Sequence, residues 1–167
     1  LNSKDGKLGC VCLESLEKTL QKNEGRVNYV AIMGVSNVTG IVNPINEAAE
    51  VAHRYGALFV VDGAQLAAHV PVTMSVPDNP EQNIDALVFS GHKTYVPGSP
   101  GVVIARKDLL EQIEPEEVGG GMVEDVFVDR YVVKEVFPDR EEAGTPNIPG
   151  AVGLAAAVDV LDRISME

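Results

Sequence analysis

Polar side chains follow three apolar segments of the chain, each at the point where the apolar segment ends. They are, in chain order, Ser36 and Asn37 after residues 27–35, Asp62 and Gln65 after residues 57–61, and Ser90, His92 and Lys93 after residues 85–89. Taken singly, each could be a turn cap or a solvated surface group. Taken together, they offer an amine, an imidazole, a carboxylate, hydroxyls and amides at three equivalent positions.

This set of side chains suits chemistry in which Lys93 forms a Schiff base. An amine reacts in this way only after it loses its proton, which burial and a neighbouring cation favour. A carboxylate such as Asp62 could keep a heteroaromatic nitrogen protonated and so make that ring an electron sink. Pyridoxal 5'-phosphate (PLP) is the cofactor that combines a lysine Schiff base with an acidic partner for its pyridinium nitrogen.

The elements that must position these residues are predicted from the spacing of apolar residues. Leu13, Leu16 and Leu20 have the spacing of an amphipathic helix. A second helix is predicted between Pro44 and Gly56, because proline favours the first helical turn and glycine the residue after the end. Apolar runs of strand length occupy residues 27–35, 57–62 and 85–90, and a fourth strand turns into a helix within residues 101–110.

Uninterrupted strands that alternate with helices predict an α/β fold with a mostly parallel sheet, flanked by helices on both faces. Because the carboxyl ends of parallel strands meet at one edge of a sheet, we expect the polar residues to converge there. After Pro115 the pattern loosens, and residues 151–164 form a predicted helix rich in small side chains. We predict one α/β domain over residues 1–167.

Composition excludes several classes of function. The 167 residues carry a formal charge of −12, which argues against a nucleic-acid partner, because phosphate binding requires clustered Lys and Arg. No long apolar run suggests a membrane span, so we expect a cytoplasmic protein. Cys10 and Cys12 have no second Cys/His pair to complete a zinc site, and we interpret them as ordinary side chains without a metal.

Four motifs resemble, in the same order, those of the class V aminotransferase-fold PLP enzymes. They are "SNVTG" (36–40), "VVDGAQ" (60–65), "FSGHK" (89–93) and "EAGTPNIPGAVGL" (142–154). The chain is most similar to the cysteine desulfurase and selenocysteine lyase group. This resemblance implies the central part of the large PLP-binding domain of fold type I, which is incomplete here. It also implies a longer protein of which this chain, beginning at Leu1, is a segment.

The resemblance implies a role for each matching residue. Lys93 corresponds to the lysine that forms the Schiff base and moves protons, Asp62 to the acid paired with the pyridine nitrogen, and Gln65 to the residue bonding the phenolic oxygen of PLP. The remaining positions are Ser90 and His92 at the phosphate, Asn37 beside the cofactor and substrate carboxylate, and Thr145, which reaches the phosphate of the other subunit in a homodimer.

The resemblance further implies conversion of cysteine to alanine, with the sulfur held on the enzyme and passed to an acceptor protein. In the family, the residue stacked on the PLP ring, the arginine that binds the substrate carboxylate and the nucleophilic cysteine lie in segments with no counterpart here. Neither Cys10 nor Cys12 matches that nucleophile. We therefore expect this chain alone to bind PLP weakly and to be inactive.

Three alternatives remain open at the sequence level. The same fold could catalyse another PLP reaction on an amino acid, such as a transamination. It could also serve as an interaction module without the cofactor. A nucleotide-binding Rossmann domain is disfavoured, because no G-x-G-x-x-G follows the first apolar run.

Overall fold

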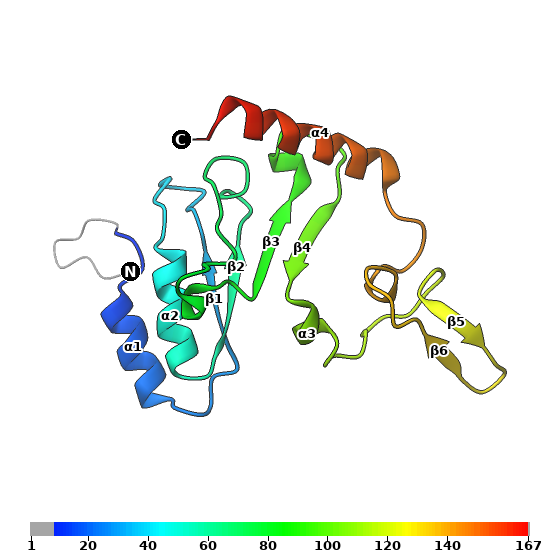
Figure 1. Ribbon diagram of the computed structural model, residues 1–167, viewed down its shortest axis with the longest axis horizontal. Helices are drawn as coiled ribbons and strands as arrows, with labels where there is room; N and C mark the ends of the chain where they lie inside the picture. Colours follow the sequence, from blue (N-terminus) through cyan, green and yellow to red (C-terminus); the bar gives the residue numbers. More distant parts are fainter. Residues whose placement is uncertain (1–8, 167) are drawn as a thin grey trace.

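The structure is a computed structural model that describes residues 9–166 (Figure 1). The helices are α1 (Leu13–Lys22), α2 (Ile45–Arg54), α3 (Lys107–Leu110) and α4 (Ile148–Ile164), with short 3-10 turns η1 (Pro80–Gln82), η2 (Gly91–Lys93) and η3 (Asp139–Glu141). The strands are β1 (Tyr29–Met33), β2 (Leu58–Asp62), β3 (Ala86–Ser90), β4 (Gly101–Ala105), β5 (Val123–Val126) and β6 (Tyr131–Val133). The predicted helices and strands are therefore present; β1 to β3 are shorter than the apolar runs that predicted them, and α4 begins three residues earlier than predicted.

The main sheet has the strand order β1-β2-β3-β4. The pairs β1·β2 and β2·β3 are parallel, while β3 and β4 are antiparallel. A parallel connection requires a crossover of a dozen or more residues, and residues 91–100 between β3 and β4 are too few for one. The predicted α/β class with a mostly parallel sheet is confirmed.

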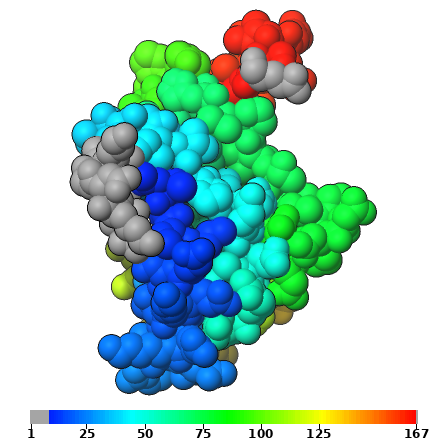
Figure 2. Space-filling model, turned by 90° about the vertical axis from the view of Figure 1, so that its left-hand side faces the viewer, coloured from blue at the N-terminus to red at the C-terminus, as the bar shows by residue number. Residues whose placement is uncertain are grey.

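One face of this sheet carries the core of the described chain. Helix α2 buries Ile45, Ala48, Ala49 and Ala52, which share one side of the helix, against Phe59 of β2 and its neighbours. Helix α1 lies beside α2, as the blue and cyan surfaces in Figure 2 show. These amphipathic helices form because their apolar stripes have a sheet face on which to pack.

The opposite face of the sheet is open among residues 9–166. Alternation along the strands places Tyr29, Met33, Val88 and Val103 on this face, with exposed fractions of 61%, 47%, 42% and 65%. The prediction that helices cover both faces is therefore wrong for the described residues. The strands are apolar on both sides, as in a doubly covered sheet, but the helices α1 and α2 both pack on the same side.

Helix α4 crosses above the ends of β3 and β4 (Figure 1). It is apolar over most of its length, yet only Gly150 and Leu161 are buried. No helix within residues 9–166 has the length and apolar character needed to cross a membrane.

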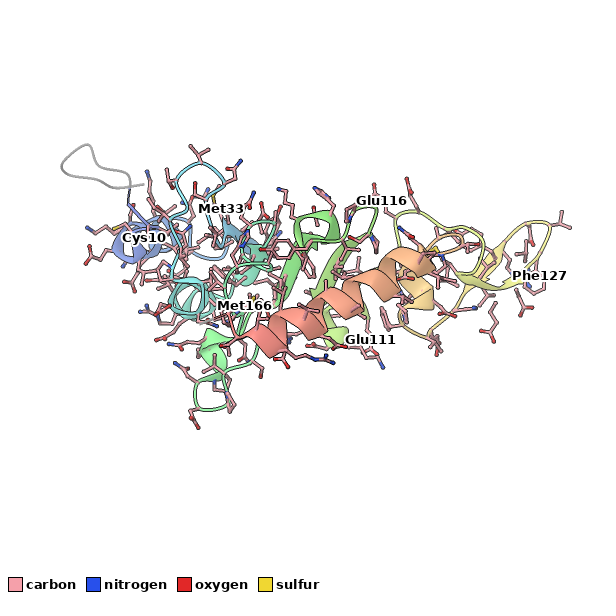
Figure 3. All side chains as sticks on the ribbon, turned by 90° about the horizontal axis from the view of Figure 1, so that it is seen from above. Cys10, Met33, Glu111, Glu116, Phe127 and Met166 are labelled. Atoms are coloured by element: carbon pink, nitrogen blue, oxygen red, sulfur yellow. The ribbon has the colours of Figure 1, made fainter. Side chains whose placement is uncertain are left out.

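The hairpin of β5 and β6 projects from the sheet (Figure 1). In the view from above, Phe127 at its tip lies at the opposite end of the molecule from Cys10 and Met33 (Figure 3). Phe127 and Val128 are exposed there. The loose pattern predicted after Pro115 corresponds to this hairpin and the loops that flank it.

A buried carboxylate, Asp85, joins the amino ends of the strands. Its side chain is fully buried and accepts hydrogen bonds from Phe59 N–H (2.7 Å), His53 Nε2 (2.8 Å) and Arg106 Nη1 (2.7 Å). The other ring nitrogen of His53 lies 2.6 Å from the Glu81 carbonyl oxygen, so both ring nitrogens are engaged. Asp85 thereby connects α2, β2, β3 and the end of β4.

Removing the Asp85 charge is expected to destabilise the fold. Burial alone would raise the pKa of Asp85, but the hydrogen bonds from His53, Phe59 N–H and Arg106 outweigh it and hold this pKa below its ordinary value of 3.8. The carboxylate therefore contributes stability that is present above pH 3.8 and is lost as pH falls below it through the lower pKa of the folded chain. Asp85→Asn should lower the free energy of unfolding at pH 7 by about 3 kcal/mol.

The measurement is urea unfolding of Asp85→Asn and wild type between pH 3 and pH 7. The difference between the two proteins should shrink as the pH falls, because wild type loses the contribution of the carboxylate. Asp108→Asn, which removes an exposed partner of Arg106, is the control and should have little effect. A stability difference that does not depend on pH would contradict the assigned role of the Asp85 charge.

Candidate functional site

The carboxyl ends of β1 and β2 and the turn after β3 meet at one edge of the sheet. A small hollow of about 170 Å³ lies there and is lined by Met33, Val35, Asn37, Asp62, Ala64, Gln65 and Lys93. Four of the seven predicted site residues, namely Asn37, Asp62, Gln65 and Lys93, therefore share one hollow. The strand register explains this arrangement, because Asp62 lies level with Met33 on one side and Val88 on the other.

Asp62 is the last residue of β2 and its side chain is exposed. One carboxylate oxygen, Oδ1, accepts a hydrogen bond from Ala64 N–H at 2.9 Å. The backbone continues close to β3, with Gly63 N–H donating to the Val88 carbonyl oxygen at 2.8 Å. The carboxylate is therefore held by the turn that follows β2 and still faces the hollow.

Lys93 closes the 3-10 turn η2, which starts directly after β3. Its neighbour Thr94 is buried, and Thr94 N–H donates to the Gly91 carbonyl oxygen at 2.9 Å. Tyr95 then adopts φ +62°, a left-handed conformation that is uncommon for a bulky residue and turns the chain sharply. Among residues 9–166, no ion pair or hydrogen bond engages Lys93 Nζ.

Three predicted site residues do not line the hollow. Ser90 is half-buried at the end of β3, and His92 is exposed on the turn η2. Thr145 is exposed in the segment before α4, between Gly144 and Pro146. Their roles remain predictions that rest on the family resemblance.

Ser36 has a local structural role instead. Its Oγ accepts weak hydrogen bonds from Val38 N–H (3.3 Å) and Thr39 N–H (3.2 Å), which close the turn after β1. This turn presents the neighbouring Asn37 to the hollow. Ser36 is therefore a turn-capping residue, one of the two roles that the sequence allowed for it.

Sequence reasoning missed the apolar wall of the hollow, which Met33, Val35 and Ala64 supply. Met33 is half-exposed at the end of β1, directly beside Asp62 in the register. The available signal was that Met33 and Val35 end an apolar run, just before the polar residues Ser36 and Asn37.

The residues that line the hollow fit PLP by the chemistry of their side chains. An amine, a carboxylate and two amides stand beside an apolar wall, and this combination suits an aromatic ring that carries an aldehyde, a basic nitrogen and a phenolic oxygen. Within residues 9–166, no group of three or more His, Cys, Asp or Glu side chains could hold a metal ion. Both cysteines are free thiols, and neither lines the hollow.

Comparison with known proteins identifies relatives of the whole chain. A probable cysteine desulfurase of Halalkalibacterium halodurans is 44% identical over 159 residues, which are 95% of this chain and 37% of that protein. The apo structure of a cysteine desulfurase from Thermococcus onnurineus NA1 matches with a TM-score of 0.82 and 39% identity, over 95% of this chain and 37% of that one. An Escherichia coli cysteine desulfurase structure matches with a TM-score of 0.78 and 36% identity, over 90% and 36%.

The chain thus spans about 37% of the length of the curated relatives that it matches. The family model "Aminotransferase class-V" matches residues 4–167, which is nearly the whole chain. This match confirms the resemblance inferred from the four sequence motifs. The chain belongs to the aminotransferase class-V family.

Proposed function

We propose that this chain is the cofactor-binding centre of a PLP-dependent cysteine desulfurase, which converts cysteine to alanine and retains the sulfur on the enzyme. The hollow that brings Lys93, Asp62 and Gln65 together is the observation that carries this proposal. The names of the relatives support cysteine as the substrate. Because the chain spans about 37% of those relatives, the reaction is assigned to the full-length protein.

When bound, PLP supplies an aldehyde that condenses with amines and a pyridine ring that withdraws electrons. Lys93 would hold the aldehyde carbon through Nζ and would serve as the base for the proton on the substrate Cα. Asp62 would hold a proton on the ring nitrogen, and Gln65 would bond the phenolic oxygen. Asn37 would lie beside the substrate carboxylate, with Ser90 and His92 at the phosphate.

The overall conversion balances without an external oxidant or reductant. The bond between Cβ and sulfur of cysteine breaks, an enzyme thiolate forms a new sulfur–sulfur bond, and a proton reaches Cβ to give alanine. The thiolate would come from outside this chain, because neither Cys10 nor Cys12 lines the hollow. For the same reason we propose that the isolated chain does not turn over.

The proposal includes a homodimer, a sulfur-acceptor protein and a cytoplasmic location. Thr145 supports the homodimer, because it is exposed and does not line the hollow of its own chain. In a dimer it could reach the phosphate site of the second subunit. The absence of a membrane-spanning helix from residues 9–166 is compatible with the location.

Reduction with borohydride tests whether Lys93 is the reactive amine. The chain and the full-length protein are mixed with PLP, reduced and mapped by mass spectrometry. Selective labelling of Lys93 is expected, because its Nζ shares the hollow with Asp62 and Gln65. Lys93→Ala should abolish that labelling, while Lys107→Ala, which removes an exposed lysine paired with Glu111, should leave it unchanged. Scattered labelling of full-length wild type would contradict the proposed site.

Substitution of Asp62 tests its role at the cofactor ring. Asp62→Asn keeps the oxygen that accepts Ala64 N–H, so the melting temperature should stay unchanged. Alanine formation from cysteine by the full-length protein should fall by a factor of at least about 100, because the amide cannot hold the ring proton. Asp78→Asn, at an exposed loop position, should retain full activity. A wild-type protein that releases another product in a screen of amino acids would instead favour a different PLP reaction.

Substitution of Thr145 tests the dimeric site. Thr145→Ala should weaken PLP retention of the full-length dimer by about tenfold, the effect of losing one hydrogen bond to a charged group. The measurement is the PLP concentration that restores absorbance to the apoprotein. Thr73→Ala, an exposed threonine elsewhere, serves as the control. Unchanged retention in a confirmed dimer would remove Thr145 from the phosphate site.

A further inference from the structure

Asn147 connects two segments through the two ends of its side-chain amide. As the N-cap residue of α4, its Oδ1 accepts a hydrogen bond from Gly150 N–H at 3.1 Å. Its Nδ2 donates to the Gly98 carbonyl oxygen at 2.6 Å. The first bond is an ordinary helix cap, but the second reaches 49 residues back in the sequence, into the loop that follows Lys93.

The loop that contains Gly98 returns to the turn that carries Lys93. At one end, Thr94 N–H donates to the Gly91 carbonyl oxygen at 2.9 Å. At the other end, Gly91 N–H donates to the Pro100 carbonyl oxygen at 3.1 Å. Both ends of this loop, at Thr94 and Pro100, are thus hydrogen-bonded to Gly91, two residues before Lys93. A shift of the loop would therefore displace the turn η2.

Glycines allow these segments to approach closely. A Cβ at Gly91 would lie 2.7 Å from the Pro100 carbonyl oxygen, and a Cβ at Gly150 would lie 2.9 Å from Ser99 Cα. Gly153 approaches Val96 in the same way, with a Cβ at 2.9 Å from Val96 Cγ1. The first turns of α4, the loop and η2 are therefore packed without space for independent movement.

We propose that Asn147 is a positioning residue for Lys93, acting through the Gly98 carbonyl group to hold the loop and hence the turn η2. The proposal rests on the function proposed above for Lys93. Aspartate at this position could accept Gly150 N–H equally well but, unlike asparagine, has no N–H to donate to Gly98.

The substitution Asn147→Asp separates the two bonds. Aspartate keeps an acceptor for Gly150 N–H, but it cannot donate to Gly98 and sets a carboxylate against that carbonyl oxygen. Asn147→Ala loses both bonds. Asn46→Asp is the matched control, because the amide of Asn46 also donates to backbone carbonyl groups, those of Thr73 and Gln82, and Asn46 does not line the hollow.

Two readouts are compared in the full-length protein. Hydrogen exchange at the amides of Gly91 and Thr94 should be at least about tenfold faster in Asn147→Asp than in wild type, the effect of one lost hydrogen bond. The amide of Gly150 should stay protected, because its acceptor is retained. The rate at which borohydride traps PLP on Lys93 should fall by about tenfold in Asn147→Asp and Asn147→Ala, and should stay unchanged in Asn46→Asp.

The outcomes separate the failure of each proposal. If Asn147→Asp matches wild type in both readouts while only Asn147→Ala is impaired, Asn147 is a helix cap alone and the inference is wrong. If wild-type Lys93 is not labelled selectively, the proposed function fails. Hydrogen exchange at Gly91 and Thr94 still decides in that case whether Asn147 holds the turn.

Discussion

The carboxylate of Asp85 is the interaction on which the arrangement of the sheet depends. It lies fully buried at the start of β3, where its side chain accepts from the backbone of β2, from His53 of α2 and from Arg106 after β4. Its own backbone N–H and C=O bond to Phe59 and Arg106. An unpaired buried carboxylate would be very costly, so these three segments can pack only with their partners in place. The register of the strands is therefore fixed at their amino ends.

The candidate site lies at the opposite ends of the same strands. Asp85 holds β2 and β3 in register at their amino ends, and each strand is five residues long. Asp62 therefore lies at the carboxyl end of β2 and the turn with Lys93 at the carboxyl end of β3. The amino ends thus hold Asp85 with its partners His53 and Arg106, while the carboxyl ends present the Lys93 amine, for which residues 9–166 provide no partner. In open α/β sheets, ligands bind outside the carboxyl ends of the strands, which is the end where this hollow lies.

Much of this arrangement could be predicted from the sequence. The parts that could not be predicted depend on contacts between residues that are far apart in the chain. Apolar runs and capping residues indicated the helices and strands, and the strand ends indicated Asn37, Asp62, Gln65 and Lys93. Asp85 was overlooked because an acid before an apolar run has the same pattern as a surface turn, and only its burial reveals its partners. The contact between Asn147 and Gly98 joins residues 49 positions apart, a separation that local periodicity cannot detect.

The open sheet face and the hollow share two residues. Met33 and Asp62 belong to both, since alternation along the strands places them on the face that the described helices leave exposed. Apolar side chains such as Tyr29 and Val103 on that face favour burial, at about 25 cal/mol per Å² of apolar surface removed from water. An element that covers this face beside Met33 and Asp62 would also remove water from the hollow that these two residues line. The same contact that buries the apolar side chains of the sheet would then also shield the proposed site from water.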